Sequence, residues 1–151
     1  MLAAMFAFAH HFAAFSLFAA LVVELVLVRS ELTLASARRL LRADLVYGIA
    51  AASILAIGFA RVKWFEKTPA YYLHSATFIA KIALFALIGL LSIYPTRMLL
   101  GWRKALAAGE LPTLDAATRS RLAFVIHLEL VLLVALILCA ALMAKGVGQI
   151  T

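Results

Sequence analysis

Long, uninterrupted stretches of apolar residues run along most of the chain, and short polar connections separate them. Four such stretches are rich in Leu and Ala and lie at about residues 4–28, 45–62, 75–96 and 122–144. A helix needs roughly 20 apolar residues to cross a hydrocarbon core of about 30 Å, whereas a spanning strand would alternate over about 10 residues. The pattern therefore predicts an all-α integral membrane protein, in which residues 1–151 form one domain built as a four-helix bundle.

Composition agrees with this fold class. Hydrophobic residues make up 67% of the chain and charged residues 14%, and the mean hydropathy is +1.09. These values exclude an ordinary soluble domain. No Lys or Arg precedes the first apolar stretch, and its end lacks a small-residue cleavage site, so we expect a permanent helix rather than a signal peptide. The lipid bilayer is the first expected partner.

The distribution of basic residues predicts how the bundle is oriented. Nine lie in the first and third predicted connections: Arg29, Arg38, Arg39, Arg42, Arg97, Arg103, Lys104, Arg119 and Arg121. Four lie in the second connection and the C-terminal tail: Arg61, Lys63, Lys67 and Lys145. The positive-inside rule places the larger group in the cytoplasm, so both termini should be periplasmic. These basic residues lack interleaved aromatic residues, so nucleic acid is not an expected partner.

A lysine interrupts the third apolar stretch, in the segment "FIAKIALF" at residues 78–85. A charge at the centre of a bilayer costs on the order of 3 kcal/mol, so Lys81 needs a partner or a function. It lies seven residues beyond His74, which corresponds to about 10 Å below the outer boundary. His10 and His11 should lie at nearly the same depth in the first helix, because both helices enter from the same side.

A histidine and a lysine amine at one level suggest axial ligation of a haem iron. We expect an apolar cavity around them, lined by Phe12, Phe15, Phe78 and Phe85. The candidate ligands are His10, His11 and Lys81, with His74 two turns above Lys81 on the same helix face. Arg61 and Lys63, at the outer end of the second helix, would meet the haem propionates. No C-x-x-C-H motif is present, so the predicted cofactor is non-covalent haem b.

Two other interpretations of Lys81 remain open. Its side chain leans toward the outer surface and could reach the headgroups, or it could form an ion pair with Glu129. The two adjacent histidines point about 100° apart. Glu24 lies within about 40° of His10 on the helical wheel but about 140° from His11, so His10 faces the bundle if Glu24 does.

Sequence motifs for other enzymatic reactions are missing. The chain contains no G-x-S-x-G, H-E-x-x-H, Walker loop or C-x-x-C motif, so serine or zinc hydrolysis and nucleotide hydrolysis have no signature. The four Met residues are dispersed, which gives no support for copper transport.

Several segments carry a family resemblance. The run "YYLHSATFIAKIALFALIGLLSIYPTRMLLGWR", with "AHHFAAFSLFAALVVELVLVRSEL", "SARRLLRADLVYGIAAASILAIGFAR" and "HLELVLLVALILCAALMAKGVG", resembles a family of small, uncharacterised bacterial inner-membrane proteins. More distantly, the plan is similar to that of HemJ-type protoporphyrinogen oxidases and CopD-like membrane proteins. The matching positions are His10 or His11, Arg38, Arg39, Leu40 and Lys81. The resemblance implies a multi-pass protein of the bacterial inner membrane that binds haem b and acts as an oxidoreductase or electron carrier.

A second hypothesis belongs to a different functional class. The chain could be a non-catalytic accessory or structural subunit of a membrane complex, in which the polar residues serve only helix packing. Whether the chain forms a homo-oligomer or joins a larger membrane complex is left open by the sequence. Non-covalent pigment in the purified protein distinguishes the two hypotheses, because only the first requires haem.

Overall fold

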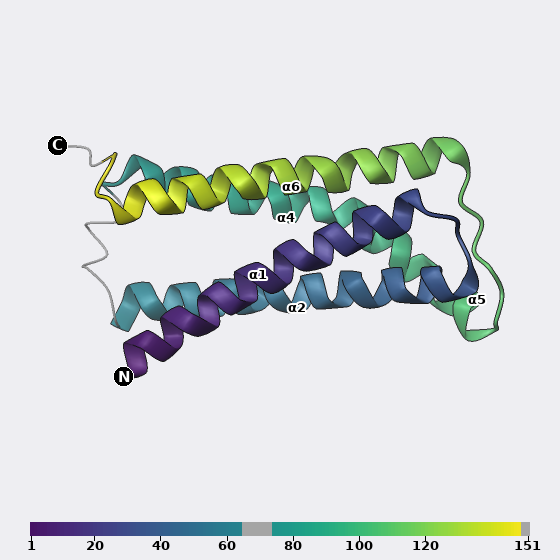
Figure 1. Ribbon diagram of the computed structural model, residues 1–151, viewed down its shortest axis with the longest axis horizontal. Coiled ribbons are helices and arrows are strands. Elements are labelled where there is room, and N and C mark those ends of the chain that lie inside the picture. The colour runs from purple at the N-terminus through teal and green to yellow at the C-terminus, as the bar shows by residue number, and fades with distance from the viewer. Residues whose placement is uncertain (65–73, 149–151) are drawn as a thin grey trace.

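Four long helices pack side by side in the computed structural model, which describes residues 1–64 and 74–148. The helices are α1 (Leu2–Arg29), α2 (Leu34–Trp64), α4 (Ala76–Gly101), the short α5 (Arg103–Ala107) and α6 (Ala116–Ala144). No strand is present in this part of the chain. The prediction of an all-α four-helix bundle is therefore confirmed (Figure 1).

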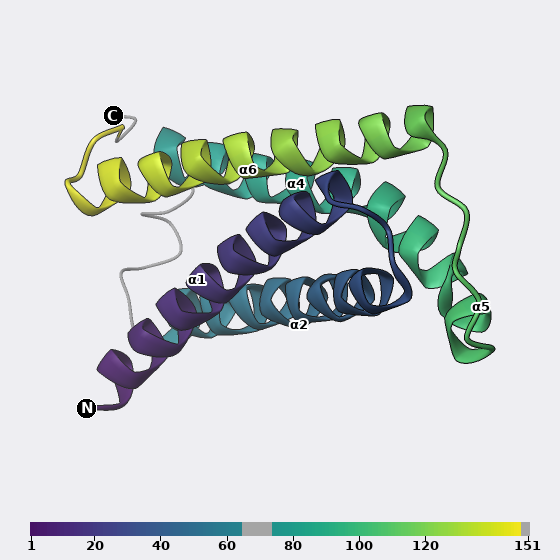
Figure 2. The ribbon, with the colours of Figure 1, turned by 45° about the vertical axis from the view of Figure 1, so that its right-hand side comes forward.

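The helices are not packed equally closely. α1 crosses the bundle diagonally and contacts both α2 and α6, and α4 packs along α6 (Figures 1 and 2). α2 and α4 contact each other much less than these pairs do. The start of α1 and the end of α6 lie at one end of the bundle, and α5 and the α1–α2 connection lie at the other (Figure 1). The α2–α4 side is therefore the part of the bundle that separates with the least loss of packing.

All four long helices are long and apolar enough to cross a membrane. Even α4, with 26 residues, measures about 39 Å at 1.5 Å per residue, which exceeds the hydrocarbon thickness. The helices extend beyond the apolar stretches of the sequence. α2 begins at Leu34, about three turns before the predicted span, and α4 continues through the buried Pro95 to Gly101. Hydropathy identifies the part of each helix that is apolar enough to lie in lipid, but it does not identify the polar extensions of the same helices.

Side-chain caps fix two of the helix starts. Before α2, the backbone N–H of Thr33 donates to Ser36 Oγ (2.8 Å), and the N–H of Ser36 donates to Thr33 Oγ1 (3.1 Å). This reciprocal arrangement satisfies backbone donors as a capping box does. At α6, Asp115 accepts from the Thr118 N–H at 2.9 Å, so Asp115 caps the start of this helix. The hydrogen bonds from Thr118 hold the pKa of Asp115 below its ordinary value.

Most buried side chains of the bundle are aliphatic, while many large apolar side chains, aliphatic and aromatic, are exposed on the outside. Leu21, Leu40 and Ile126 are fully buried. Phe8 and Phe124 are 72% and 65% exposed. In water such surface would be unfavourable, but in a bilayer it is the surface that contacts lipid tails. The structure thus agrees with the bilayer as a partner of these helices.

The orientation of the bundle gives a direct prediction. Because the start of α1 and the end of α6 lie at one end of the bundle, a single fusion after α6 reports on the side of the membrane from which α1 starts. Lys67, one of the four basic residues assigned to the periplasmic side, is outside the described residues. We expect a periplasm-dependent reporter, such as alkaline phosphatase, to be active when fused after Thr151, while the same reporter placed between Ala108 and Leu111 is inactive. The opposite pattern of activities would show that the bundle has the reverse orientation in the membrane, which would contradict the prediction.

Candidate functional site

His10 and Lys81 line the same pocket, although they belong to different helices. The pocket has a volume of about 100 Å³, and its walls come from all four long helices: His10, Ile54, Leu55, Gly58, Phe59, Val62, Phe78, Lys81, Ile82, Phe85 and Leu136. Apart from the imidazole and the amine, the walls are apolar. We call this cavity the His10–Lys81 pocket. The expectation that a histidine of the first helix and Lys81 lie at similar depth agrees with this geometry.

The helix phase selects His10 over His11. Glu24 is 2% exposed, so the face of α1 that carries both Glu24 and His10 is turned into the bundle. His11 is exposed, and its Nδ1 lies 2.6 Å from the carbonyl oxygen of Ala7 on the same helix. The choice between the two histidines is therefore reduced to one candidate, His10.

Gly58 makes room for the imidazole. A Cβ atom built at this position would lie 3.5 Å from Cε1 of His10, which is an ordinary van der Waals distance. Only a methyl group would therefore fit there without displacing the ring. The pairing of a small residue on α2 with a histidine on α1 allows these two helices to approach closely at this level.

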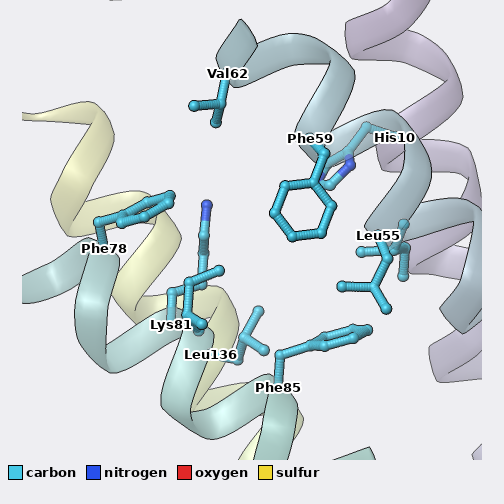
Figure 3. Close-up of a pocket in the computed structure, with 11 residues that line it drawn as sticks. His10, Leu55, Phe59, Val62, Phe78, Lys81, Phe85 and Leu136 are labelled. Carbon is cyan, nitrogen blue, oxygen red and sulfur yellow. The ribbon is translucent and has the colours of Figure 1, made fainter. Parts of the chain in front are cut away.

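The Lys81 amine lies over an aromatic ring. Its Nζ is 5.2 Å from the centroid of Phe78, within the range of a cation–π interaction. Figure 3 shows the Phe59 ring between the Lys81 side chain and His10. Phe59 is also 69% exposed, so it lies at the mouth of the pocket. A ligand held between the amine and the imidazole would have to displace the Phe59 ring.

The aromatic lining was predicted only in part. Phe78 and Phe85 line the pocket as expected. Phe12 and Phe15 do not line it, and they are 64% and 73% exposed. The prediction for these two residues is wrong, since being near His10 in sequence does not place a side chain on the same helix face. Phe59 on α2 was missed because it is distant from His10 and Lys81 in sequence, although it lines the same pocket.

The predicted basic and outer residues lie around the pocket rather than in it. Arg61 is half-buried and precedes Val62, a pocket residue, on α2. Lys63 is exposed, with its Nζ 4.9 Å from the Trp64 ring centroid. His74 is exposed and lies just before α4 begins. Arg61 is therefore the basic residue best placed, by position along α2, to meet an acidic group at the pocket mouth.

The donor set limits which cofactor fits. Among residues 1–64 and 74–148, no group of three or more His, Cys, Asp or Glu side chains could hold a metal ion. A bare zinc or copper ion needs three or four protein ligands, which the pocket does not supply. A haem brings four ligands of its own and needs one or two from the protein. The imidazole of His10 and the amine of Lys81 match that requirement.

A second polar region was not predicted as a unit. Glu24, Asp44 and Glu129 are only 2%, 6% and 1% exposed, and they come from α1, α2 and α6. Glu24 lies within electrostatic range of both other carboxyl groups, and Thr96 of α4 donates a 2.6 Å hydrogen bond to Asp44. This region could have been found by its composition, because all three acids lie inside helices that are apolar enough to cross the membrane.

Comparisons with known proteins identify a family and nothing more detailed. The sequence model of a family described as "Predicted membrane protein (DUF2214)" matches residues 2–148. No curated protein matches the chain, and no solved structure does. The expected membership of an uncharacterised membrane-protein family is confirmed. The likeness to HemJ-type and CopD-like proteins gains no support from these comparisons and stays a prediction.

Proposed function

The chain belongs to the DUF2214 family of predicted membrane proteins, and from this premise and the pocket geometry we propose that it binds haem b within the membrane. His10 and Lys81 are the proposed axial ligands. The observation that carries the proposal is the convergence of these two nitrogen donors, from α1 and α4, on one apolar pocket. The proposed location is the bacterial inner membrane, with the pocket in the periplasmic half of the bundle.

The pocket must widen to hold a porphyrin. Its volume of about 100 Å³ is below the range of about 300–1,000 Å³ typical of small-molecule sites. Widening requires α4 to move away from α2, and these two helices contact each other less than the pairs α1–α2, α4–α6 and α1–α6 do. Phe59 at the mouth would rotate outward into lipid, where an apolar ring has a favourable environment. The bundle thus has a site where expansion breaks few contacts.

The chain's own residues would hold the cofactor and exclude water. His10, packed against Gly58, is restricted in position, and Lys81 would bind through a neutral amine in the apolar surroundings of Phe78 and Phe85. Arg61 would pair with a propionate near the pocket mouth. A haem held by the nitrogens of His10 and Lys81 would supply electron transfer. An electron-transfer role is therefore the activity that we propose.

A non-catalytic accessory subunit is the second candidate. The cation–π geometry of Lys81 and Phe78 favours it, because that interaction stabilises the protonated amine and requires no cofactor. In this case the pocket would be a packing defect at the α2–α4 side, and its polar residues would serve helix association or contacts with partner subunits.

The test is the colour of the purified protein. Full-length protein from haem-replete cells should show a Soret band, and acid-acetone should extract all of the pigment, because no covalent attachment motif is present. A colourless preparation that is folded and helical by circular dichroism would favour the accessory subunit and overturn the proposal.

Gly58 offers a steric test of the pocket. Gly58→Ala should retain pigment, since its methyl group would be 3.5 Å from the His10 ring. Gly58→Leu should lose most of it, because the larger side chain displaces the imidazole or fills the pocket. The ratio of Soret to protein absorbance measures the difference. Equal ratios for the two variants would place the pigment elsewhere in the protein.

A further inference from the structure

Three carboxyl groups are buried inside the bundle, on three different helices. Glu24, Asp44 and Glu129 come from α1, α2 and α6, and each is more than nine-tenths buried. Oε1 of Glu24 and both carboxyl oxygens of Glu129 are buried and accept no hydrogen bond from any residue of the described chain. A buried polar atom with no hydrogen bond is costly, and a carboxylate without compensation is more so.

The charged and titratable groups that interact with this cluster are themselves acidic. Glu24 interacts electrostatically with Asp44 and Glu129, and Glu129 interacts with Asp44. Tyr47 of α2 lies within electrostatic range of all three carboxyl groups. From α4 the cluster receives a hydroxyl, Thr96, which donates to Asp44 at 2.6 Å. Three ionised carboxylates at this site would repel one another in a medium of low dielectric constant.

A cavity leads from the α2–α4 side to one member of the cluster. It has a volume of about 270 Å³ and is lined by Asp44, Tyr47, Gly48, Ala51, Phe85, Ile88, Gly89, Ser92, Ile93 and Thr96. A water molecule occupies about 30 Å³ of liquid and needs two or more polar partners. The carboxyl of Asp44 and the hydroxyls of Tyr47, Ser92 and Thr96 supply such partners. We call this cavity the Asp44 pocket.

The chemistry of the cluster favours protons over metal ions. In the described ranges, the acidic groups do not form a set that could hold a metal ion. Glu24 and Glu129 do not line the Asp44 pocket. A proton needs no cavity beside them, and it neutralises a carboxyl group that burial would otherwise penalise.

We propose that Glu24, Asp44 and Glu129 form a proton-binding site within the membrane. Water in the Asp44 pocket delivers protons to Asp44, and Glu24 and Glu129 hold them in the bundle interior. Intramembrane carboxyl groups with this arrangement are typical of proton relays. The site is independent of the proposed haem, because it uses none of the residues of the His10–Lys81 pocket other than Phe85, which forms a wall of both cavities.

Infrared spectroscopy of the full-length protein in lipid nanodiscs tests the proton site. At neutral pH the wild type should show a carbonyl stretch of protonated carboxylic acid. Glu24→Gln and Glu129→Gln should each remove part of that band, and Glu31→Gln, at an exposed position in the α1–α2 connection, should leave it unchanged. A wild-type spectrum without the band, or a band of undiminished intensity in both Gln variants, would overturn the proposal.

Proton delivery through the Asp44 pocket can be tested separately, by substituting glycines inside and outside that pocket. Gly89 lines the Asp44 pocket, and no side chain lies within 4 Å of the place that a Cβ atom would take there, so Gly89→Leu places a side chain in the cavity. The carboxylic-acid band should then persist but shift severalfold more slowly after transfer to D₂O. Gly101→Leu, outside the pocket, should exchange at the wild-type rate. Equal rates for all three proteins would contradict proton delivery through this pocket.

Discussion

Replacing His10 with Ala is expected to abolish most haem binding, while His11→Ala leaves it intact. The two residues are neighbours in sequence, but their side chains point to different sides of α1. His10 lines the pocket and packs against Gly58, whereas His11 is exposed and lies within hydrogen-bonding distance of the Ala7 carbonyl. Loss of an axial ligand removes a metal–nitrogen bond that the remaining histidines are not placed to restore, because none of them lines the pocket.

The pair of variants is its own control. Both remove one imidazole from α1, so general effects on helix stability should be similar. Haem content per chain, measured after extraction and at equal protein concentration, should be near the wild-type value for His11→Ala and far below it for His10→Ala. If the two variants retain equal amounts of haem, His10 is not a ligand.

Truncating Leu21 is expected to destabilise the bundle by about 2 kcal/mol, the lower end of the range for buried leucines. Leu21 is 0% exposed on α1, the helix that contacts both α2 and α6. Lipid tails are as apolar as the bundle interior, so removing the side chain loses little transfer free energy. What remains is the loss of van der Waals contacts around the cavity that Leu21→Ala creates.

Val22 provides the matched position for this experiment. It follows Leu21 on the same helix and is 38% exposed, so its side chain loses fewer protein contacts on truncation. Val22→Ala should change the free energy of unfolding by much less than Leu21→Ala, as measured by denaturation in mixed micelles. Equal changes would show that the face of α1 assigned to the core is wrong.

The bundle itself could be predicted from sequence because apolar length alone decides it. A stretch of some 20 apolar residues has few stable alternatives to a helix in a bilayer. Apolar length alone does not give the helix ends, since α2 begins well before the apolar stretch, at a local Thr33–Ser36 capping arrangement. Capping of α6 by Asp115 was predictable, because it depends on residues adjacent in sequence.

The site could be predicted where one helix carried the information. Glu24 and His10 share a face of α1, so the burial of one predicts the direction of the other. The contributions of α2 were missed, namely Gly58 and Phe59 in the His10–Lys81 pocket and Asp44 in the carboxyl cluster. Those positions depend on how α2 is rotated against its neighbours, which is set by packing between separate helices and not by the sequence of α2 alone.

The spectrum of Lys81→Met tests the proposed ligation most directly. Met has a similar length and supplies a thioether, a different axial ligand, so the variant should fold and retain haem while its Soret position shifts from that of the wild type. Lys81 would then be an iron ligand. If Lys81 is held only by its cation–π contact with Phe78, the variant should show the wild-type spectrum at full haem content, and that result would contradict the assignment of Lys81.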